Sequence, residues 1–292
     1  MSQRSPNTER GEALAIICGG GSLPFAVADA AIRRGRRVVL FALRGWADPQ
    51  RVAAYPHHWS WMGQFGRFRR VAAREGCRDV VFIGSVVRPS FSQLRPDLWA
   101  LPLIPRLVRL FRGGDDHLLS GVGRILEEHG FRLLGPQEVA PELLMPPGVV
   151  GAQTPSGRDW ADVTRGVALL RATSPFDIGQ AAVVANNQVL ALEGPEGTDQ
   201  MLARVADLRR AGRIQSSLGA GVLVKATKVG QNPRLDPPSI GPQTVEGTAA
   251  AGLAGIAVIA GTTIVAEPER IAAIADRAKI FIVGVNPDGS AP

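Results

Sequence analysis

Short apolar runs alternate with helix-forming stretches along the first half of the chain, and this alternation restricts the possible fold more than any other feature. The runs cover residues 13–18, 37–43 and 79–84, and the stretches between them include residues 25–32 and 68–75. Parallel strands buried on both faces are continuously apolar, and they need helical connections of this length. The pattern therefore predicts an α/β protein with a Rossmann-like N-terminal domain.

A section rich in proline and glycine, between residues 136 and 159, lacks clear periodicity and is followed by a second set of alternating segments. Such a section is typical of a domain boundary. We therefore expect four parts, which are a disordered leader (1–12), the Rossmann-like N-terminal domain (13–140), a linker (141–158) and a distinct C-terminal α/β catalytic domain (159–292).

The chain is basic, with a formal net charge of +7 and a pI of about 10.5. Its cations are spread without a long basic tract, so we expect no nucleic-acid partner. The charge suits phosphorylated ligands or an anionic membrane surface, although a high arginine content is also typical of a GC-rich genome. Because the polar N-terminus is no secretory signal and no apolar run reaches the roughly eighteen residues of a membrane span, we expect a cytoplasmic protein that does not cross a membrane but can be peripheral on one.

Several common kinds of active site are excluded by the residue inventory. Both cysteines, Cys18 and Cys77, lie in apolar runs that predict buried positions, without a disulfide or metal-binding spacing. None of the four histidines stands in a metal-binding motif, and we expect the adjacent pair, His57 and His58, to lie in a solvated loop. The chain has no Gly-x-Ser-x-Gly motif and no Walker loop. If it is an enzyme, carboxylates and cations must carry the chemistry.

A glycine turn between the first apolar run and the first helix is a candidate anion site. Backbone N–H groups at such a turn can bind a phosphate, so Gly19, Gly20, Gly21, Ser22 and Leu23 are candidate substrate-binding residues. The dinucleotide fingerprint fails, however, since proline follows at the position of its third glycine and the second apolar run ends at an arginine instead of an acid. A nucleotide, phosphate or sugar site remains open, and so does a tight turn without a ligand.

The densest group of polar residues occupies positions 225–241, directly after an apolar run of the second half. It combines the cations Lys225, Lys228 and Arg234 with the acid Asp236. Loops after strand carboxyl ends are where α/β proteins bind ligands, and this composition suits phosphate-ester hydrolysis, in which cations neutralise phosphoryl oxygens and a carboxylate orients water or holds a metal. A solvated surface loop with local ion pairs is the alternative.

Other acids in the chain allow similar alternatives. Asp115 and Asp116 are typical of a helix start, and a metal or ribose contact is the more specific interpretation. Asp177 and the turn that holds Glu196 and Asp199 fit helix caps equally well.

Seven motifs occur in order along nearly the whole chain after the leader. They are Ile17-Cys-Gly-Gly-Gly-Ser-Leu-Pro24, Gly84-Ser-Val-Val-Arg88-Pro89, Gly114-Asp-Asp116, Asp177-Ile-Gly-Gln180, Glu196-Gly-Thr-Asp199, residues 225–241 and Gly252-Leu-Ala-Gly-Ile256. Together they resemble the UDP-2,3-diacylglucosamine pyrophosphatases of alphaproteobacteria. The resemblance implies a Rossmann-like domain followed by a distinct α/β domain, and a Mg²⁺-dependent hydrolase of lipid A biosynthesis. Its substrate would be UDP-2,3-diacylglucosamine, attacked at the β-phosphorus, and its products UMP and 2,3-diacylglucosamine 1-phosphate (lipid X).

The resemblance also assigns roles to individual residues. The family's essential aspartate, in an Arg-x-Asp-Leu-Pro motif, matches Asp236, although Pro237 replaces the leucine and Val229-Gly230 replaces a Lys-Pro step. Asp236 would bind Mg²⁺ or orient water, with Lys225, Lys228 and Arg234 as the other catalytic residues. The expected substrate-binding residues in this half are Asp177, Gln180, Glu196, Thr198, Asp199 and Gln231. A homodimer is a further expectation, and the alternatives are a non-catalytic nucleotide-sugar sensor and a pyrophosphatase with another nucleotide-linked substrate.

Overall fold

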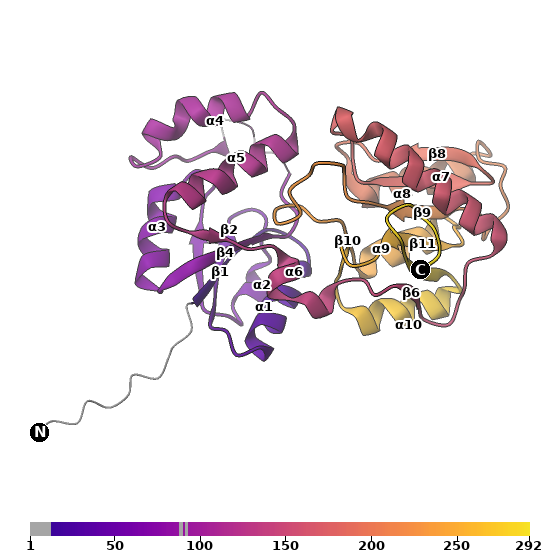
Figure 1. The fold of residues 1–292 in the computed structure, drawn as a ribbon, viewed down its shortest axis with the longest axis horizontal. Helices are drawn as coiled ribbons and strands as arrows, with labels where there is room; N and C mark the ends of the chain where they lie inside the picture. The colour runs from indigo at the N-terminus through magenta and orange to yellow at the C-terminus, as the bar shows by residue number, and fades with distance from the viewer. Residues whose placement is uncertain (1–12, 88–89, 91–92) are drawn as a thin grey trace, which may run out of the picture. The chain divides into compact units, whose positions relative to one another are not determined.

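The computed structural model describes residues 13–87, 90 and 93–292 (Figure 1). The expected leader and the Arg88-Pro89 step of the second motif lie outside these residues. The chain forms two compact units, Met1–Ala140 and Pro141–Pro292, each with its own sheet. Two α/β units of this kind confirm the predicted fold class.

The first unit is built on a five-stranded parallel sheet with the strand order β3-β2-β1-β4-β5. Its strands are β1 (Ala13–Cys18), β2 (Val38–Leu43), β3 (His57–Ser60), β4 (Cys77–Ile83) and β5 (Arg132–Leu133). Its helices are α1 (Leu23–Arg33), α2 (Pro49–Val52), α3 (Phe65–Arg74), α4 (Ile104–Leu110), α5 (Asp115–Glu128) and α6 (Pro136–Val139), with a 3₁₀ turn, η2 (Leu101–Leu103), before α4. The order reverses between β1 and β4, and α/β proteins bind ligands at such a switch point.

Helices cover both faces of this sheet (Figure 1). On one face, Phe68 of α3 and Leu126 of α5 pack with Phe41 and Val80 of the strands. Helix α1 packs against β1 and β2 from the other face. Burial on both faces explains why the strands are apolar without alternation, and why Cys18 and Cys77 are buried free thiols.

The second unit holds a six-stranded mixed sheet in the order β6-β13-β11-β9-β7-β8, and a short parallel pair of β10 with β12. Its strands are β6 (Gly148–Val150), β7 (Ala181–Ala185), β8 (Gln188–Leu192), β9 (Val222–Lys225), β10 (Ser239–Ile240), β11 (Gly255–Ile259), β12 (Ile264–Val265) and β13 (Phe281–Val285). Its helices are α7 (Gly157–Thr173), α8 (Gly197–Arg210), α9 (Pro242–Ala250) and α10 (Pro268–Ala278), with 3₁₀ turns η3 (Pro141–Leu143) and η4 (Ser174–Phe176).

Helix α7 covers one face of this sheet through Val163, Val167 and Leu170. Helices α8, α9 and α10 cover the other face. The hairpin between β7 and β8 turns at Asn186 and Asn187, which both have positive φ, and their N–H groups donate to the buried carboxylate of Asp162 in α7. Asparagine tolerates this left-handed backbone, so the turn sequence determines where the two strands meet.

Two expectations differ from the structure. Residues 141–158 belong to the second unit, because β6 within them pairs antiparallel with β13 and so extends the sheet. His57 and His58 form strand β3 and are half-buried, and Nε2 of His58 lies 2.9 Å from Oε1 of Glu75. A four-residue strand with a histidine pair carries no apolar run, which is why the sequence pattern indicated a loop. Among the described residues, no helix is long and apolar enough to cross a membrane.

Candidate active site

One edge of the second sheet gathers most of the polar residues that the sequence analysis selected. Strand β9 ends at Lys225, which pairs with Ala181 at the start of the antiparallel strand β7. Gln180 therefore lies beside Ala226, whose N–H donates to its carbonyl oxygen at 3.0 Å. The end of β8 reaches the same edge, since the N–H of Glu193 donates to the oxygen of Ala181. Residues separated widely in sequence are brought together here by antiparallel pairing.

Asp236 is the centre of this group. Nε2 of Gln180 donates to Oδ2 of Asp236 at 2.8 Å, and Nε2 of Gln231 donates to the same oxygen at 3.2 Å. The same two amide groups also donate to the backbone oxygen of Asp236, at 3.2 and 2.9 Å. In the part of the chain that the structure describes, no residue donates to Oδ1. The carboxylate is thus held by one oxygen, and the other is available to a ligand.

The environment of Asp236 raises the pKa of its carboxyl group. Asp236 as a residue is exposed to solvent, yet neighbouring protein atoms weaken the hydration of its carboxylate. This desolvation dominates, and it outweighs the attraction of Lys228 and Lys225, which lowers the pKa, while Glu193 raises it further. A carboxylate with a raised pKa accepts a proton more readily than an ordinary aspartate, which is the property of a general base.

Lys225 is buried at the foot of the site, with 8% of its surface exposed. Its Nζ donates to Oγ1 of Thr198 and to the backbone oxygen of Ser239, both at 2.9 Å. Oγ1 of Thr198 in turn donates to Oε1 of Glu193 at 2.6 Å. An ammonium group has three N–H donors, so these two bonds position Lys225 and leave it one donor for a ligand.

The two other predicted cations are held within the loop itself. Nζ of Lys228 forms an ion pair with Oδ1 of Asp177 at 2.5 Å. Asp177 has a left-handed backbone, with a φ of 51°. The backbone N and Nε of Arg234 both donate to Oδ1 of Asn232, at 3.1 and 3.3 Å. Lys228 acts on the Asp236 carboxylate through its field.

Asp199 and Glu196 have different surroundings at the start of α8. Desolvation raises the pKa of Asp199, the attraction of Lys225 lowers it, and Glu193 raises it further, so Asp199 shares neighbours with Asp236. Glu196 lies 2.8 Å from the guanidinium group of Arg204. Hydrogen bonds from backbone N–H groups and from Arg204 hold the Glu196 pKa below its usual value. Asp199 therefore belongs to the cluster around Asp236, and Glu196 is engaged with α8.

Glu193 was missed by the sequence analysis, although it connects several members of the cluster. Its side chain is buried, Oε2 accepts from the N–H of Gln180 at 2.6 Å, and Oε1 accepts from Thr198. The one available signal was an acid placed immediately after the apolar run 188–192. Thr227 of the same loop was also missed, and its buried Oγ1 has no hydrogen-bond partner among the described residues.

The glycine turn of the first unit lies at the carboxyl end of β1. The N–H groups of Gly19 and Gly20 donate to backbone oxygens of Ile83 and Ser85, so they are occupied by β4 and the turn after it. A Cβ atom on Gly19 would lie 2.8 Å from the oxygen of Ser85, and Gly21 has a φ of 85°. These glycines are thus required by close backbone approach and by conformation.

The N–H groups of Gly21, Ser22 and Leu23 have no hydrogen-bond acceptor among the described residues, so the start of α1 is a candidate place for an anion. Ser22 lies at the helix N-cap position, but its side chain makes no capping hydrogen bond.

A hollow of about 610 Å³ lies at the carboxyl ends of the neighbouring strands β2 and β3. Trp46, Trp59 and Trp61 line it, and the Arg44 guanidinium lies 5.7 Å from the ring centre of Trp59 and 5.9 Å from that of Trp61. The backbone oxygen of Trp46 is 3.2 Å from an ideal Cβ position on Gly20, so the hollow adjoins the glycine turn. Flat π surfaces beside a guanidinium group suit a planar ring.

A divalent cation fits the cluster around Asp236 only in part. Within residues 13–87, 90 and 93–292, no group of three or more His, Cys, Asp or Glu side chains could hold a metal ion. Mg²⁺ is nevertheless often bound by one or two carboxylates, with water and substrate phosphate oxygens as its other ligands. Oδ1 of Asp236 is a suitable oxygen ligand. The donor set therefore fits a cation shared with a bound phosphate.

The fold and the site define a two-domain α/β protein whose second domain presents a desolvated carboxylate among lysines and amide donors at a sheet edge. Family models of the LpxI N-terminal domain and the LpxI C-terminal domain match residues 13–143 and 146–283. The chain is also 41% identical over 274 residues to the UDP-2,3-diacylglucosamine pyrophosphatase LpxI of Caulobacter vibrioides, which covers 94% of this chain and 98% of that relative. This chain belongs to the LpxI family, which confirms the family resemblance seen in its motifs.

Proposed function

We propose that this protein hydrolyses the pyrophosphate bond of UDP-2,3-diacylglucosamine to UMP and 2,3-diacylglucosamine 1-phosphate in lipid A biosynthesis. The observation that carries the proposal is the Asp236 carboxylate, which is held through Oδ2 by two amides and is desolvated opposite Lys225 and Lys228. Similarity to a protein named UDP-2,3-diacylglucosamine pyrophosphatase over nearly the whole chain supports the choice of substrate.

In the proposed reaction, Asp236 orients a water molecule through Oδ1 and accepts its proton. The water oxygen bonds to the β-phosphorus, the bond from that phosphorus to the bridging oxygen breaks, and UMP leaves with the bridging oxygen. Negative charge builds on the phosphoryl and bridging oxygens, and Lys225 and Lys228 stabilise it from a site with little competing water. Gln180 and Gln231 are positioning residues, because they hold the carboxylate in one orientation.

Mg²⁺ is the proposed cofactor, with phosphate oxygens of the substrate as ligands; coordination by Oδ1 of Asp236 is the alternative to its role as base, since Oδ2 is already bonded to Gln180 and Gln231. When bound, it would neutralise phosphoryl charge and polarise the reacting phosphate. Asp199 is placed to assist, since its carboxyl group shares the field of Lys225 and Glu193 with Asp236. Glu196 is a weaker candidate, because its carboxylate pairs with Arg204.

We further propose that the glycine turn and the tryptophan-lined hollow of the first unit bind a uridine nucleotide. The N–H groups of Gly21 to Leu23 would meet a phosphate, and the indole rings around Arg44 would stack on the uracil ring. Both features lie at the carboxyl edge of the first sheet, next to its switch point between β1 and β4.

The test is incubation of the purified protein with UDP-2,3-diacylglucosamine, with Mg²⁺ or with EDTA, and measurement of UMP and the sugar phosphate. We expect stoichiometric release of both products, lost in EDTA and restored by added Mg²⁺. Attack in ¹⁸O-labelled water should place the label on the sugar phosphate. Substrate that stays intact over hours with Mg²⁺ would favour the sensor alternative, and faster cleavage of another UDP-sugar would favour a different pyrophosphatase.

A further inference from the structure

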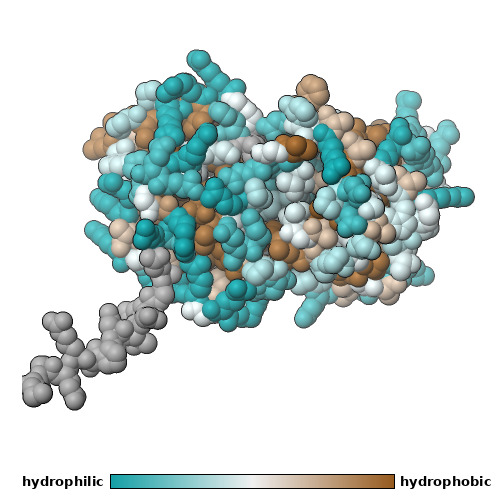
Figure 2. Space-filling view, viewed as in Figure 1, coloured by the Kyte–Doolittle hydropathy of each residue, from teal (hydrophilic) through white to brown (hydrophobic). Residues whose placement is uncertain are grey.

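A short segment of the first unit exposes large apolar side chains to solvent. Leu98, Leu101 and Ile104, together called the leucine surface, are 86%, 48% and 36% exposed. They are spaced by three residues through the turn η2 into the start of α4. In Figure 2, brown surface is visible at the end of α4 among teal side chains. Isolated exposed leucines are common, but three within seven residues mark an interaction surface.

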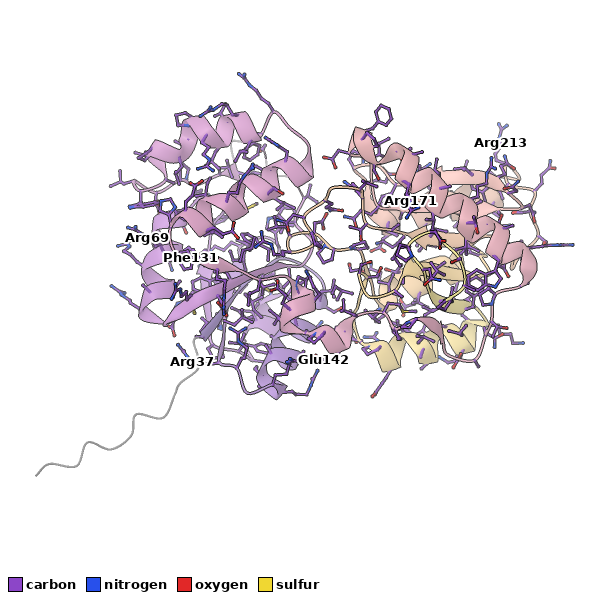
Figure 3. All side chains as sticks on the ribbon, in the orientation of Figure 1. Arg37, Arg69, Phe131, Glu142, Arg171 and Arg213 are labelled. Carbon is purple, nitrogen blue, oxygen red and sulfur yellow. The ribbon has the colours of Figure 1, made fainter. Side chains whose placement is uncertain are left out.

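The residues behind the leucine surface are firmly packed. The ring of Trp99 lies 5.2 Å from that of Phe65 and 4.8 Å from that of His129, and the guanidinium group of Arg69, labelled in Figure 3, is 4.1 Å from its centre. Ala100, between Leu98 and Leu101, and Leu110 of α4 are buried. The segment is therefore anchored through its inner side chains, and its outer side chains remain without a partner among the described residues.

Arginines outnumber acids in the segment that carries the leucine surface. Residues 93–112 contain four arginines and one acid, Asp97. The Asp97 carboxylate is used by the backbone N–H groups of Arg67 and Ala100. Arg106 forms a two-bond ion pair with Glu128, while Arg109 and Arg112 are exposed and have no carboxylate partner among the described residues. Apolar side chains flanked by arginines are typical of a surface that contacts anionic lipid.

We propose that the leucine surface docks on an anionic lipid bilayer, with its apolar side chains entering the interface and Arg109 and Arg112 meeting lipid headgroups. This inference rests on the proposed function for its purpose, because a diacylated substrate resides in a membrane. A second copy of this chain is a less suitable occupant, since its own leucine surface would bring the same positive charge against the first.

The test is co-sedimentation of the protein with vesicles of phosphatidylcholine, with and without phosphatidylglycerol. We expect binding to the anionic vesicles that weakens as salt is raised. Changing Leu98 and Leu101 to Gln should weaken binding on the order of tenfold, and changing Arg109 and Arg112 to Gln should weaken it about fivefold per charge. Leu218→Gln, at a leucine 79% exposed in the second unit, is the matched control and should bind as wild type does. Equal melting temperatures would show that the variants are folded.

Wild-type protein that stays in the supernatant with anionic vesicles would overturn the inference, and so would unchanged binding by the Leu98 and Leu101 double variant. A wild-type dimer that this variant converts to a monomer in light scattering would also overturn it, in favour of an interface between copies. The rate of hydrolysis of substrate dispersed in detergent, measured without vesicles, distinguishes failure of the docking proposal from failure of the proposed function. Activity without vesicle binding refutes docking alone, and vesicle binding without activity refutes the proposed function alone.

Discussion

Replacing Asp236 with Asn tests whether its charge serves chemistry or structure. The amide is nearly the same size, and its oxygen can accept both hydrogen bonds that Gln180 and Gln231 now donate to Oδ2. What disappears is the base and a unit of negative charge. Loss of a general base costs about 10²- to 10⁴-fold in rate, which corresponds to about 2.7–5.5 kcal/mol in the barrier. We expect a fall of that size in kcat, with a modest change in KM.

The same substitution should not destabilise the protein. Because the pKa of Asp236 is higher in the folded than in the unfolded chain, the fold binds its proton more tightly. Its contribution to stability is therefore fully present below the unfolded pKa and is lost as pH rises through the folded pKa. At neutral pH the ionised carboxylate opposes folding, and the neutral amide removes this opposition. The melting temperature at pH 7 should stay equal or rise.

The assay is the initial rate of UMP release at several substrate concentrations, with thermal unfolding of the same samples. Asp207→Asn, at an exposed aspartate of α8, is the matched control and should leave both quantities unchanged. Turnover within about threefold of wild type would refute the role of Asp236 in the chemistry. A large loss of rate together with a marked fall in melting temperature would refute the argument that its charge opposes folding.

Three further predictions concern Lys225, Glu193 and Asp79. Lys225→Met should lower kcat by about 10²- to 10³-fold in single-turnover experiments, because it removes a positioned cation, and a loss confined to KM would contradict this role. Glu193→Gln should move the acid limb of the pH–rate profile to lower pH, since the Glu193 charge raises the pKa of Asp236; a shift upward would oppose the assignment. Asp79→Asn should lower the free energy of unfolding of the first unit by about 1.5–3 kcal/mol in urea, because it weakens the hydrogen bonds that Arg36 and Arg132 donate to this carboxylate, which is 1% exposed. Burial opposes ionisation of Asp79, but hydrogen bonds from those arginines outweigh it and lower the pKa, so the stabilisation should be lost as pH falls through the folded pKa.

Sequence order alone predicted the features that depend on neighbouring residues. The apolar runs of β1, β2 and β4, the glycine turn and the loop around Asp236 each lie within a few residues, so propensity and spacing reveal them. The two-domain α/β class and the family also follow from the sequence, because the motifs occur in order. Strand β3 was missed, because its histidines carry no apolar signal and are only half-buried, and the contact of His58 with Glu75 forms only in the folded chain.

Only the tertiary structure decided which polar residues share a site. Glu193, Thr198 and Lys225 become neighbours because β7 lies between β8 and β9 and runs antiparallel to both, which brings the ends of β8 and β9 to the start of β7. The Glu196 carboxylate, two residues before Thr198 in the sequence, instead pairs with Arg204. Asp236 could be selected from sequence as an acid among cations, but its raised pKa depends on protein atoms contributed by distant segments. Local chemistry is therefore visible in the sequence, whereas desolvation and cross-strand contacts exist only after folding.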